Sequence, residues 1–339
     1  MTKPNTPLSA SRIKTLQTCS WQYYASYILK LPSKSNHGSL RGSIVHAIFE
    51  NLGNPKHKHH YKKIVKENTI FASKAIARMV SAYVKKYKID DEDNVKLIDS
   101  MTLEGLKFDF FGKENKGLTK ALSEEKFDLN INEDGKNYRI LGFIDKLFLF
   151  KKEGRLLIRD FKTSKGVFEG KEATDNMQDL MYSLAVKYLY PDFLKRNSEF
   201  LFIKFDCRDK GHLKMEQVPD DELEGFEYFL TEVQKVINNF DIKTARSNFA
   251  YDKGYPKPEE GFAGKLVCGR ANYEGQLKKD GTLMWKCSYK LPFFYYHIFN
   301  KDKELVASVS EEDFLEKMIP KGGHHEMKYY GGCPRFNKT

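Results

Sequence analysis

The chain has 339 residues, with 57 lysines and arginines against 46 aspartates and glutamates, so its formal net charge at neutral pH is +11. Hydrophobic residues make up 40% of the chain and aromatic residues 14%, which allows a sizeable core and excludes disordered and fibrous proteins. The sequence has no apolar signal segment and no run of about 20 apolar residues, so we expect neither secretion nor a membrane span. Its five scattered cysteines favour a reducing cytoplasm over a disulfide framework.

The first predicted elements are helices. Ser9 is a suitable N-cap for a short helix over residues 8–16. The aromatic residues that follow, between Trp21 and Tyr27, have a spacing that is more typical of a core than of a surface that stacks on bases. A second helix is expected over residues 42–52.

Positive charge gathers in residues 56–88. This stretch contains ten lysines and arginines and one acid, so it holds +9 of the net charge of +11. Its apolar residues recur at helical spacing, which predicts one or two amphipathic helices with a basic outer face. Such a face suits a phosphate backbone, whose neutralisation gives a salt-dependent affinity. The residues that we expect to contact nucleic acid are Lys62, Lys63, Lys66, Arg78, Lys85 and Lys86.

From residue 124 the hydrophobic pattern changes to period two. We expect strands from 124 to a tight turn at Asp134-Gly135, then over 138–150 and, after a turn at Gly154, over 155–162, as an antiparallel meander. Thr174 is expected to cap a helix that ends near Pro191. Strands over 199–206 and 213–218 and a long helix over 220–240 complete a pattern that predicts an α/β fold.

Two acids and a lysine fall on neighbouring predicted strands. Asp145 interrupts an apolar strand, and Asp160 and Lys162 share one face at the end of the next strand. Such carboxylates can hold Mg²⁺ or Mn²⁺ against a phosphate oxygen, while Lys162 positions a water molecule or offsets developing negative charge. An Asp-x-Lys triplet alone usually lies at a solvated turn. Whether this triplet forms a catalytic site therefore has to be judged from the surrounding residues.

Five segments set this triplet in a wider pattern: Leu8-Ser9-Ala-Ser-Arg12 with Cys19 and Tyr23-Tyr24, Gly42-Ser-Ile-Val-His46, Gly142-Phe-Ile-Asp145, Asp160-Phe-Lys162-Thr163, and Gln178-Asp-Leu-Met-Tyr182. In this order, over residues 8 to 206, the chain resembles the PD-(D/E)XK nuclease superfamily, specifically its RecB-like branch, which includes the AddB nuclease domain and CRISPR adaptation nucleases. The resemblance implies a restriction-endonuclease-like core with a central mixed sheet flanked by helices, a helical N-terminal region and an irregular C-terminal extension.

The resemblance also implies roles for single residues. The metal ligands would be His46, Asp145, Asp160 and the backbone carbonyl of Phe161. The catalytic set would be Asp145, Asp160, Lys162, Gln178 and Tyr182, the last two of which share one helix face. Glu125, an acid before the first strand, would have a secondary role.

In part of this branch, one cysteine near the N-terminus and three near the C-terminus hold a 4Fe-4S cluster. Cys19 stands at the first of these positions, but Cys268 and Cys287 are nineteen residues apart around a hairpin at Lys279-Asp-Gly281, and Cys333 lies far downstream. A zinc site of Cys268, Cys287, Cys333 and either His324 or His325 is an alternative, and unliganded buried thiols are another.

Together these features predict a Mg²⁺- or Mn²⁺-dependent DNA nuclease, an exonuclease of recombination, repair or phage DNA metabolism in the cytoplasm of a bacterial or phage-infected cell. The sequence lacks the Gly-x-x-x-x-Gly-Lys-Ser/Thr motif, so unwinding of its linear single- or double-stranded DNA would need a separate helicase or recombination protein. A structure-specific endonuclease and a non-catalytic DNA-binding accessory subunit are the alternatives. We expect a helical region over residues 1–120, a nuclease core over 121–247 and a C-terminal extension over 248–339.

Overall fold

The computed structural model describes residues 4–33, 36–114, 116–250 and 268–336, so residues 251–267 of the predicted C-terminal extension lie outside it. The chain forms two compact units. The large unit consists of Met1–Ala10 and Ser35–Asn238, and the small unit of Ser11–Lys34 and Asn239–Thr339. Each unit is therefore assembled from two separated stretches of chain. None of the described helices is both long and apolar enough to cross a membrane.

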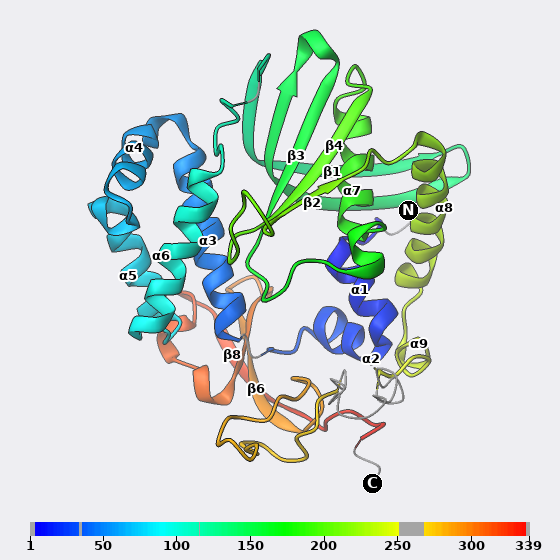
Figure 1. Ribbon diagram of the computed structural model, residues 1–339. Coiled ribbons are helices and arrows are strands. Elements are labelled where there is room, and N and C mark those ends of the chain that lie inside the picture. Colours follow the sequence, from blue (N-terminus) through cyan, green and yellow to red (C-terminus); the bar gives the residue numbers. More distant parts are fainter. Residues whose placement is uncertain (1–3, 34–35, 115, 251–267, 337–339) are drawn as a thin grey trace. The chain divides into compact units, whose positions relative to one another are not determined.

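A five-stranded mixed sheet forms the centre of the large unit (Figure 1). Its strands are β1 (Lys120–Glu133), β2 (Lys136–Phe150), β3 (Arg155–Lys162), β4 (Lys195–Phe202) and β5 (His212–Met215), adjacent in that order. Strands β3 and β4 are parallel, and the other neighbouring pairs are antiparallel. The predicted α/β fold with a central mixed sheet is confirmed.

The tight turns are also where the sequence predicts them. Asp134 and Gly135 both have positive φ, 50° and 77°, as a two-residue hairpin turn requires, and Glu133 pairs with Lys136 across it. Gly154, at a φ of 57°, ends the turn that leads into β3. Strands β4 and β5 begin earlier than expected, at Lys195 and His212.

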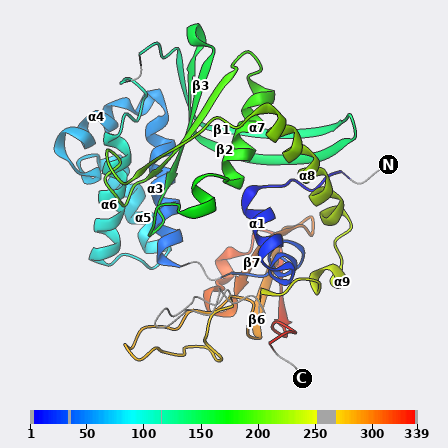
Figure 2. The same cartoon turned by 45° about the vertical axis from the view of Figure 1, so that its right-hand side comes forward.

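Four helices lie on one side of this sheet: α3 (His37–Gly53), α4 (Lys58–Glu67), α5 (Lys74–Lys86) and α6 (Glu92–Lys107) (Figures 1 and 2). Their apolar faces form one core with Phe161 of β3 and Leu201 of β4. Helix α3 begins at His37 rather than at Gly42, because the side chain of Asn36 accepts a hydrogen bond from the backbone N–H of Ser39 and caps it.

The predicted basic helices are α4 and α5. Their inner side chains, among them Ile64, Ile76 and Val80, are buried. The six basic residues expected on the outer face are all exposed: Lys62, Lys63, Lys66, Arg78, Lys85 and Lys86.

Helices α7 (Met177–Leu189) and α8 (Asp220–Asn238) lie on the other side of the sheet (Figure 1). Buried Glu227 of α8 accepts hydrogen bonds from the hydroxyls of Tyr138 and Tyr188, each at 2.7 Å, which joins this layer to β2. The cap of α7 is Asn176 rather than Thr174, since the Asn176 side chain accepts from the first backbone N–H groups of the helix.

The small unit contains short helices and an antiparallel sheet of β6 (Phe293–Phe299), β7 (Leu305–Ser310) and β8 (His324–Tyr330) with β6 in the centre. Helices α1 (Ala10–Thr18), α2 (Ser20–Tyr23) and α9 (Ile242–Ala245) belong to the part of the chain that forms it. Trp21 is buried and donates a hydrogen bond from Nε1 to the hydroxyl of Tyr330 at 2.7 Å. The aromatic residues after the first helix therefore contribute to a core, as expected.

Candidate active site

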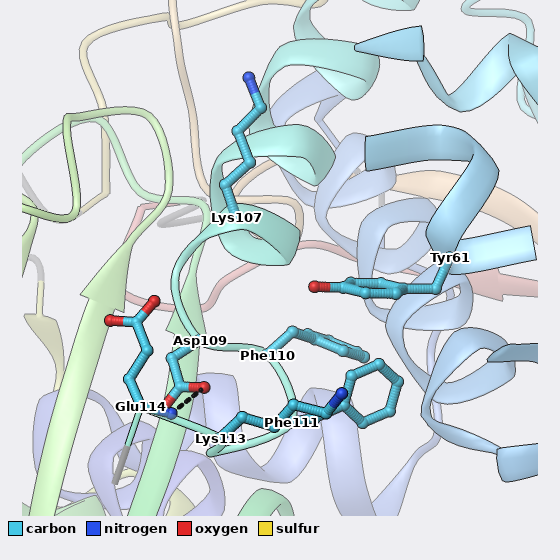
Figure 3. Close-up of a pocket in the computed structure, with 7 residues that line it drawn as sticks. All are labelled: Tyr61, Lys107, Asp109, Phe110, Phe111, Lys113 and Glu114. Atoms are coloured by element: carbon cyan, nitrogen blue, oxygen red, sulfur yellow. Dashed lines mark hydrogen bonds between the residues drawn. The ribbon is translucent and has the colours of Figure 1, made fainter. Parts of the chain in front are cut away.

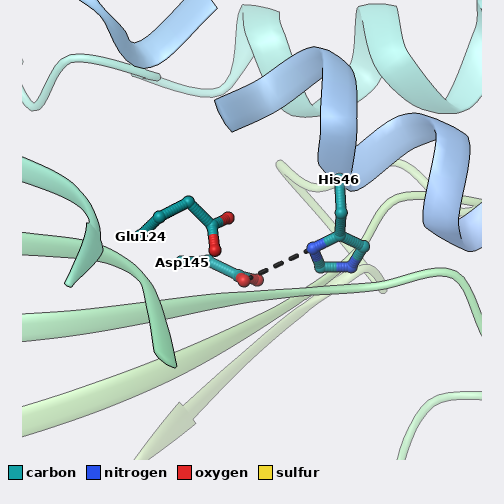
Figure 4. Close-up of side chains that lie close together, drawn as sticks. All are labelled: His46, Glu124 and Asp145. Carbon is teal, nitrogen blue, oxygen red and sulfur yellow. Dashed lines mark ion pairs between the residues drawn. The ribbon is translucent and has the colours of Figure 1, made fainter. Parts of the chain in front are cut away.

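His46, Glu124 and Asp145 converge in the large unit (Figure 4). Nδ1 of His46 lies 3.3 Å from Oδ1 of Asp145, and each of the three residues offers a ligand atom within 4.8 Å of the others. An imidazole nitrogen and two carboxylates form a donor set that suits a divalent cation. The group therefore fits the metal that the sequence predicts, although one of its members was not anticipated.

Close packing of α3 against the end of β3 brings His46 to the sheet. A Cβ atom at Gly42 would lie 2.7 Å from Oγ1 of Thr163, closer than atoms pack without displacement. The glycine one helical turn before His46 thus permits this approach.

Glu124 is a candidate ligand that was not predicted from the sequence. Its φ of 51° interrupts the regular ladder of β1 with β2, which pairs Ser123 with Lys146 and Glu125 with Ile144. Its neighbour Glu125, the acid that the sequence suggested, accepts a hydrogen bond from the hydroxyl of Tyr190 at 2.8 Å instead. The only signal in the sequence that could have indicated Glu124 as a ligand was the pair of adjacent acids.

The carboxylates around His46 give this group a strongly negative potential. Burial alone would lower the pKa of His46, but the hydrogen bond and charge of Asp145, assisted by Asp160 and Glu124, raise it to about 9. Burial and the charge of Asp145 raise the pKa of Glu124 to about 7. This clustering of acids is favourable only beside a positive charge, which the imidazolium or a metal ion provides.

Asp160 is buried and forms the centre of a hydrogen-bonded group with Lys162, Gln178 and Tyr182. Its Oδ1 accepts from Nε2 of Gln178 at 2.8 Å and from the Tyr182 hydroxyl at 2.9 Å. Its Oδ2 lies 2.6 Å from the Lys162 ammonium but accepts no well-formed hydrogen bond from the described residues. Burial raises the pKa of Asp160, and the charge of Lys162 opposes that shift.

Asp145 joins the two groups. Its Oδ2 accepts a hydrogen bond at 2.8 Å from the backbone N–H of Phe161, the residue between Asp160 and Lys162 in the chain. The predicted residues of the strands, of α3 and of α7 are thus brought together in one unit.

The four predicted cysteine ligands also converge, in the small unit. Cys19, Cys268, Cys287 and Cys333 are free thiols that line one cavity together with Trp21 and Tyr289. Burial and the neighbouring thiols raise the pKa of Cys268 to about 12. In the part of the chain that the structure describes, no three cysteine sulfurs lie within 4.8 Å of one another.

The histidines of the zinc alternative lie elsewhere. His324 stacks on Phe299 and His325 packs against Phe314, and neither lines the cysteine cavity. The predicted hairpin between Cys268 and Cys287 is present, since the backbone N–H of Lys278 donates to the carbonyl of Thr282 at 2.8 Å.

A further cavity of about 170 Å³ lies in the large unit, between α4 and the segment that follows α6 (Figure 3). Its lining residues are Tyr61, Lys107, Asp109, Phe110, Phe111, Lys113 and Glu114, and none of them is a predicted site residue. Buried Arg159 of β3 donates to the carbonyls of Phe108 and Asp109 at 3.0 and 2.8 Å and pairs with Glu199 at 2.6 Å. The cavity wall is therefore fixed to the residue next to Asp160.

A mixed sheet between helical layers, with a buried Asp-x-Lys beside a His-Glu-Asp group, defines a restriction-endonuclease-like fold with a candidate metal site. The family model of the PD-(D/E)XK nuclease superfamily matches residues 7–254, and the chain belongs to that superfamily. Members of the superfamily typically hydrolyse phosphodiester bonds and use divalent metals. No curated protein matches the chain.

Proposed function

We propose that this protein is a metal-dependent deoxyribonuclease of the RecB-like branch that removes nucleotides from the ends of linear DNA. The observation that carries the proposal is the hydrogen bond from Phe161 to Asp145, because it connects a His-Glu-Asp group to a buried Asp160–Lys162 ion pair.

The proposed ligands of the metal are His46, Glu124, Asp145, Asp160 through Oδ2, and the carbonyl of Phe161. When bound, Mg²⁺ or Mn²⁺ polarises a phosphate oxygen and lowers the pKa of a coordinated water molecule.

Lys162 has the second role in this proposal. Its ammonium is held between Oδ2 of Asp160 at 2.6 Å and Oε1 of Gln178 at 2.5 Å, so its direction is fixed before a substrate arrives. A fixed positive charge at this position stabilises the negative charge that develops on the phosphate during hydrolysis. Gln178 and Tyr182 keep Asp160 oriented, and we regard them as positioning residues.

The exposed basic faces of α4 and α5 support DNA as the substrate. Lys62, Lys63 and Lys66 lie on one such face, and their ammonium groups would neutralise backbone phosphates without reading the base sequence. The proposed setting is DNA recombination, repair or phage DNA metabolism in the cytoplasm, with a separate helicase or recombination protein supplying any unwinding.

The direct test uses end-labelled linear DNA and covalently closed circular DNA with Mg²⁺, Mn²⁺ or EDTA. We expect metal-dependent loss of linear DNA only, abolished in Asp160→Asn and retained in Asp128→Asn, a substitution of an exposed acid on β1. Cleavage of closed circles would identify an endonuclease instead. Intact DNA with every divalent cation would identify an accessory subunit.

We also propose that Cys19, Cys268, Cys287 and Cys333 hold a 4Fe-4S cluster. A single zinc ion, with sulfur ligands at about 2.3 Å, would need sulfurs roughly 3.8 Å apart, whereas no three of the described cysteine sulfurs lie within 4.8 Å of one another. Four thiols around a wider space suit a cluster better, and the absence of His324 and His325 from the lining also disfavours the zinc alternative.

A further inference from the structure

Two basic residues of the large unit lie beside the end of β3. Arg41 belongs to α3, and Lys165 belongs to the loop after β3. Gly42, the neighbour of Arg41, packs against Thr163, which precedes Lys165 by two residues. The first turns of α3 therefore lie against the residues that lead from β3 into the loop that carries Lys165, and the charges of Arg41 and Lys165 both act on Lys204.

A third basic residue, Lys204, reaches the same edge of the sheet from β4. The backbone N–H of Ile203 donates to the carbonyl of Lys162 at 3.0 Å. Because β3 and β4 are parallel, the chain leaves both strands at this edge, and Lys204 follows directly. The candidate catalytic lysine and Lys204 thus lie at the same end of adjacent strands.

The three cations are close enough to repel one another. Burial lowers the pKa of Lys204, and the charges of Arg41 and Lys165 lower it further. Nη1 of Arg41 donates to the side chain of Asn94, whereas its Nε is buried without a hydrogen-bond partner. Among the residues that the structure describes, no carboxylate forms an ion pair with any of the three.

We propose that Arg41, Lys165 and Lys204 bind a phosphate group of the substrate strand other than the one that is cleaved. A planar guanidinium and two ammonium groups are the donors that proteins use for phosphate, and uncompensated charge at this edge favours an anion. The inference rests on the proposed nuclease function and extends it from hydrolysis to the positioning of the strand.

The spacing along the chain agrees with a nearby nucleotide. Lys165 follows Lys162 by three residues, which span at most about 10 Å of extended chain. A strand advances by about 3.4 Å per nucleotide along a duplex axis, so a phosphate within a few nucleotides of the proposed point of cleavage is within reach of this site. The phosphate is either a terminal monoester or an internal diester.

The test is a binding measurement in the Asp160→Asn background, in which cleavage does not remove the probe. Short fluorescent single strands with a 5′ phosphate, a 3′ phosphate or hydroxyls at both ends are titrated by anisotropy at several salt concentrations. The test variant is Lys165→Gln with Lys204→Gln, and the matched control is Lys151→Gln with Lys152→Gln, two exposed lysines at the other end of β3. Thermal melting checks that both variants are folded.

We expect the test variant to weaken binding roughly tenfold or more. The slope of log K against log salt should fall by about 0.7 for each phosphate of a single strand that is no longer neutralised, with the control unchanged. A weakening confined to one phosphorylated end identifies a terminal phosphate, and an equal weakening for all three strands identifies an internal one. A folded test variant that binds like the control overturns the phosphate site while leaving the nuclease proposal intact. Wild-type protein that neither binds nor cleaves DNA overturns both.

Discussion

Asp179 is a buried acid of α7 whose ionisation opposes folding. It accepts a hydrogen bond from the hydroxyl of Ser198, but burial raises its pKa to about 6. A folded-state pKa above the unfolded value means that the folded state binds the extra proton, so the free energy of unfolding falls as pH rises toward 6. Above that pH the full penalty remains.

We therefore expect Asp179→Asn to gain stability relative to wild type as pH rises, because asparagine accepts the same hydrogen bond without ionising. The difference in the free energy of unfolding should grow by about 2–3 kcal/mol between pH 4 and pH 7. Urea denaturation at four pH values measures it, with the exposed Asp192→Asn as the control. A difference that is constant with pH would contradict the assignment.

Lys162 provides the sharpest test of the catalytic assignment. Lys162→Gln removes the charge proposed to stabilise the transition state, and we expect the single-turnover rate of DNA cleavage to fall by about 10²–10³. Lys195→Gln, at the exposed start of β4, should leave the rate unchanged. An unaltered rate in a folded Lys162→Gln protein would exclude the proposed role.

Residue-level prediction from the sequence succeeded where spacing within one element determines proximity. Gln178 and Tyr182 are four apart on a helix, and both reach Asp160 as that spacing implies. Glu124 was missed because its neighbour is also a glutamate, and nothing in the residue type distinguishes the acid that lies beside His46 from the one that accepts a hydrogen bond from Tyr190. Glu125 was suggested instead by the resemblance, which implies an acid before the first strand.

At the scale of elements, the contact between α3 and the end of β3 has little free space. Gly42→Ala places a methyl group against Thr163, and we expect it to cost about 1–3 kcal/mol of unfolding free energy. In a double-mutant cycle, adding Thr163→Ala to Gly42→Ala should recover roughly 0.5 kcal/mol or more of that cost. Additive effects of the two substitutions in denaturant melts would show that this contact does not set the position of α3.

The basic face of α4 allows a separate test of DNA binding. Replacing Lys62, Lys63 and Lys66 by alanine should weaken DNA binding and reduce the salt slope by up to about three. Binding is measured by anisotropy from low to moderate salt, while the metal affinity of the variant should match wild type. A salt slope equal to that of the wild type would separate this face from DNA binding.

The ends of the helices and strands depend on capping hydrogen bonds and packing that can be read only in part from the sequence. Asn36 and Asn176 cap their helices, although Gly42 and Thr174 were the expected starts, because several nearby residues could serve and tertiary packing selects among them. Strand β6 was missed because its run of apolar residues, Phe293–Phe299, shows no alternation of polar and apolar side chains.

At the scale of the whole molecule, the cysteine cavity joins residues far apart in the chain. We expect protein purified without oxygen to be brown and to contain about four iron atoms per chain, the number in one such cluster. Cys19→Ser should lose the iron, whereas Cys207→Ser, a substitution of a buried thiol outside the cavity, should keep it. Colourless wild-type protein without iron would remove the cluster from the proposal.

The divided small unit has a consequence for how the protein is made. Its first stretch ends at Lys34 and its second begins at Asn239, so roughly 200 residues of the large unit are synthesised between them. At about 5–20 residues per second, the ribosome needs on the order of 10–40 seconds for that interval. During this time the large unit can fold, while Trp21 and Tyr23 have no partners from the second stretch. Trp21 therefore stays without its hydrogen-bond partner until Tyr330 has been synthesised.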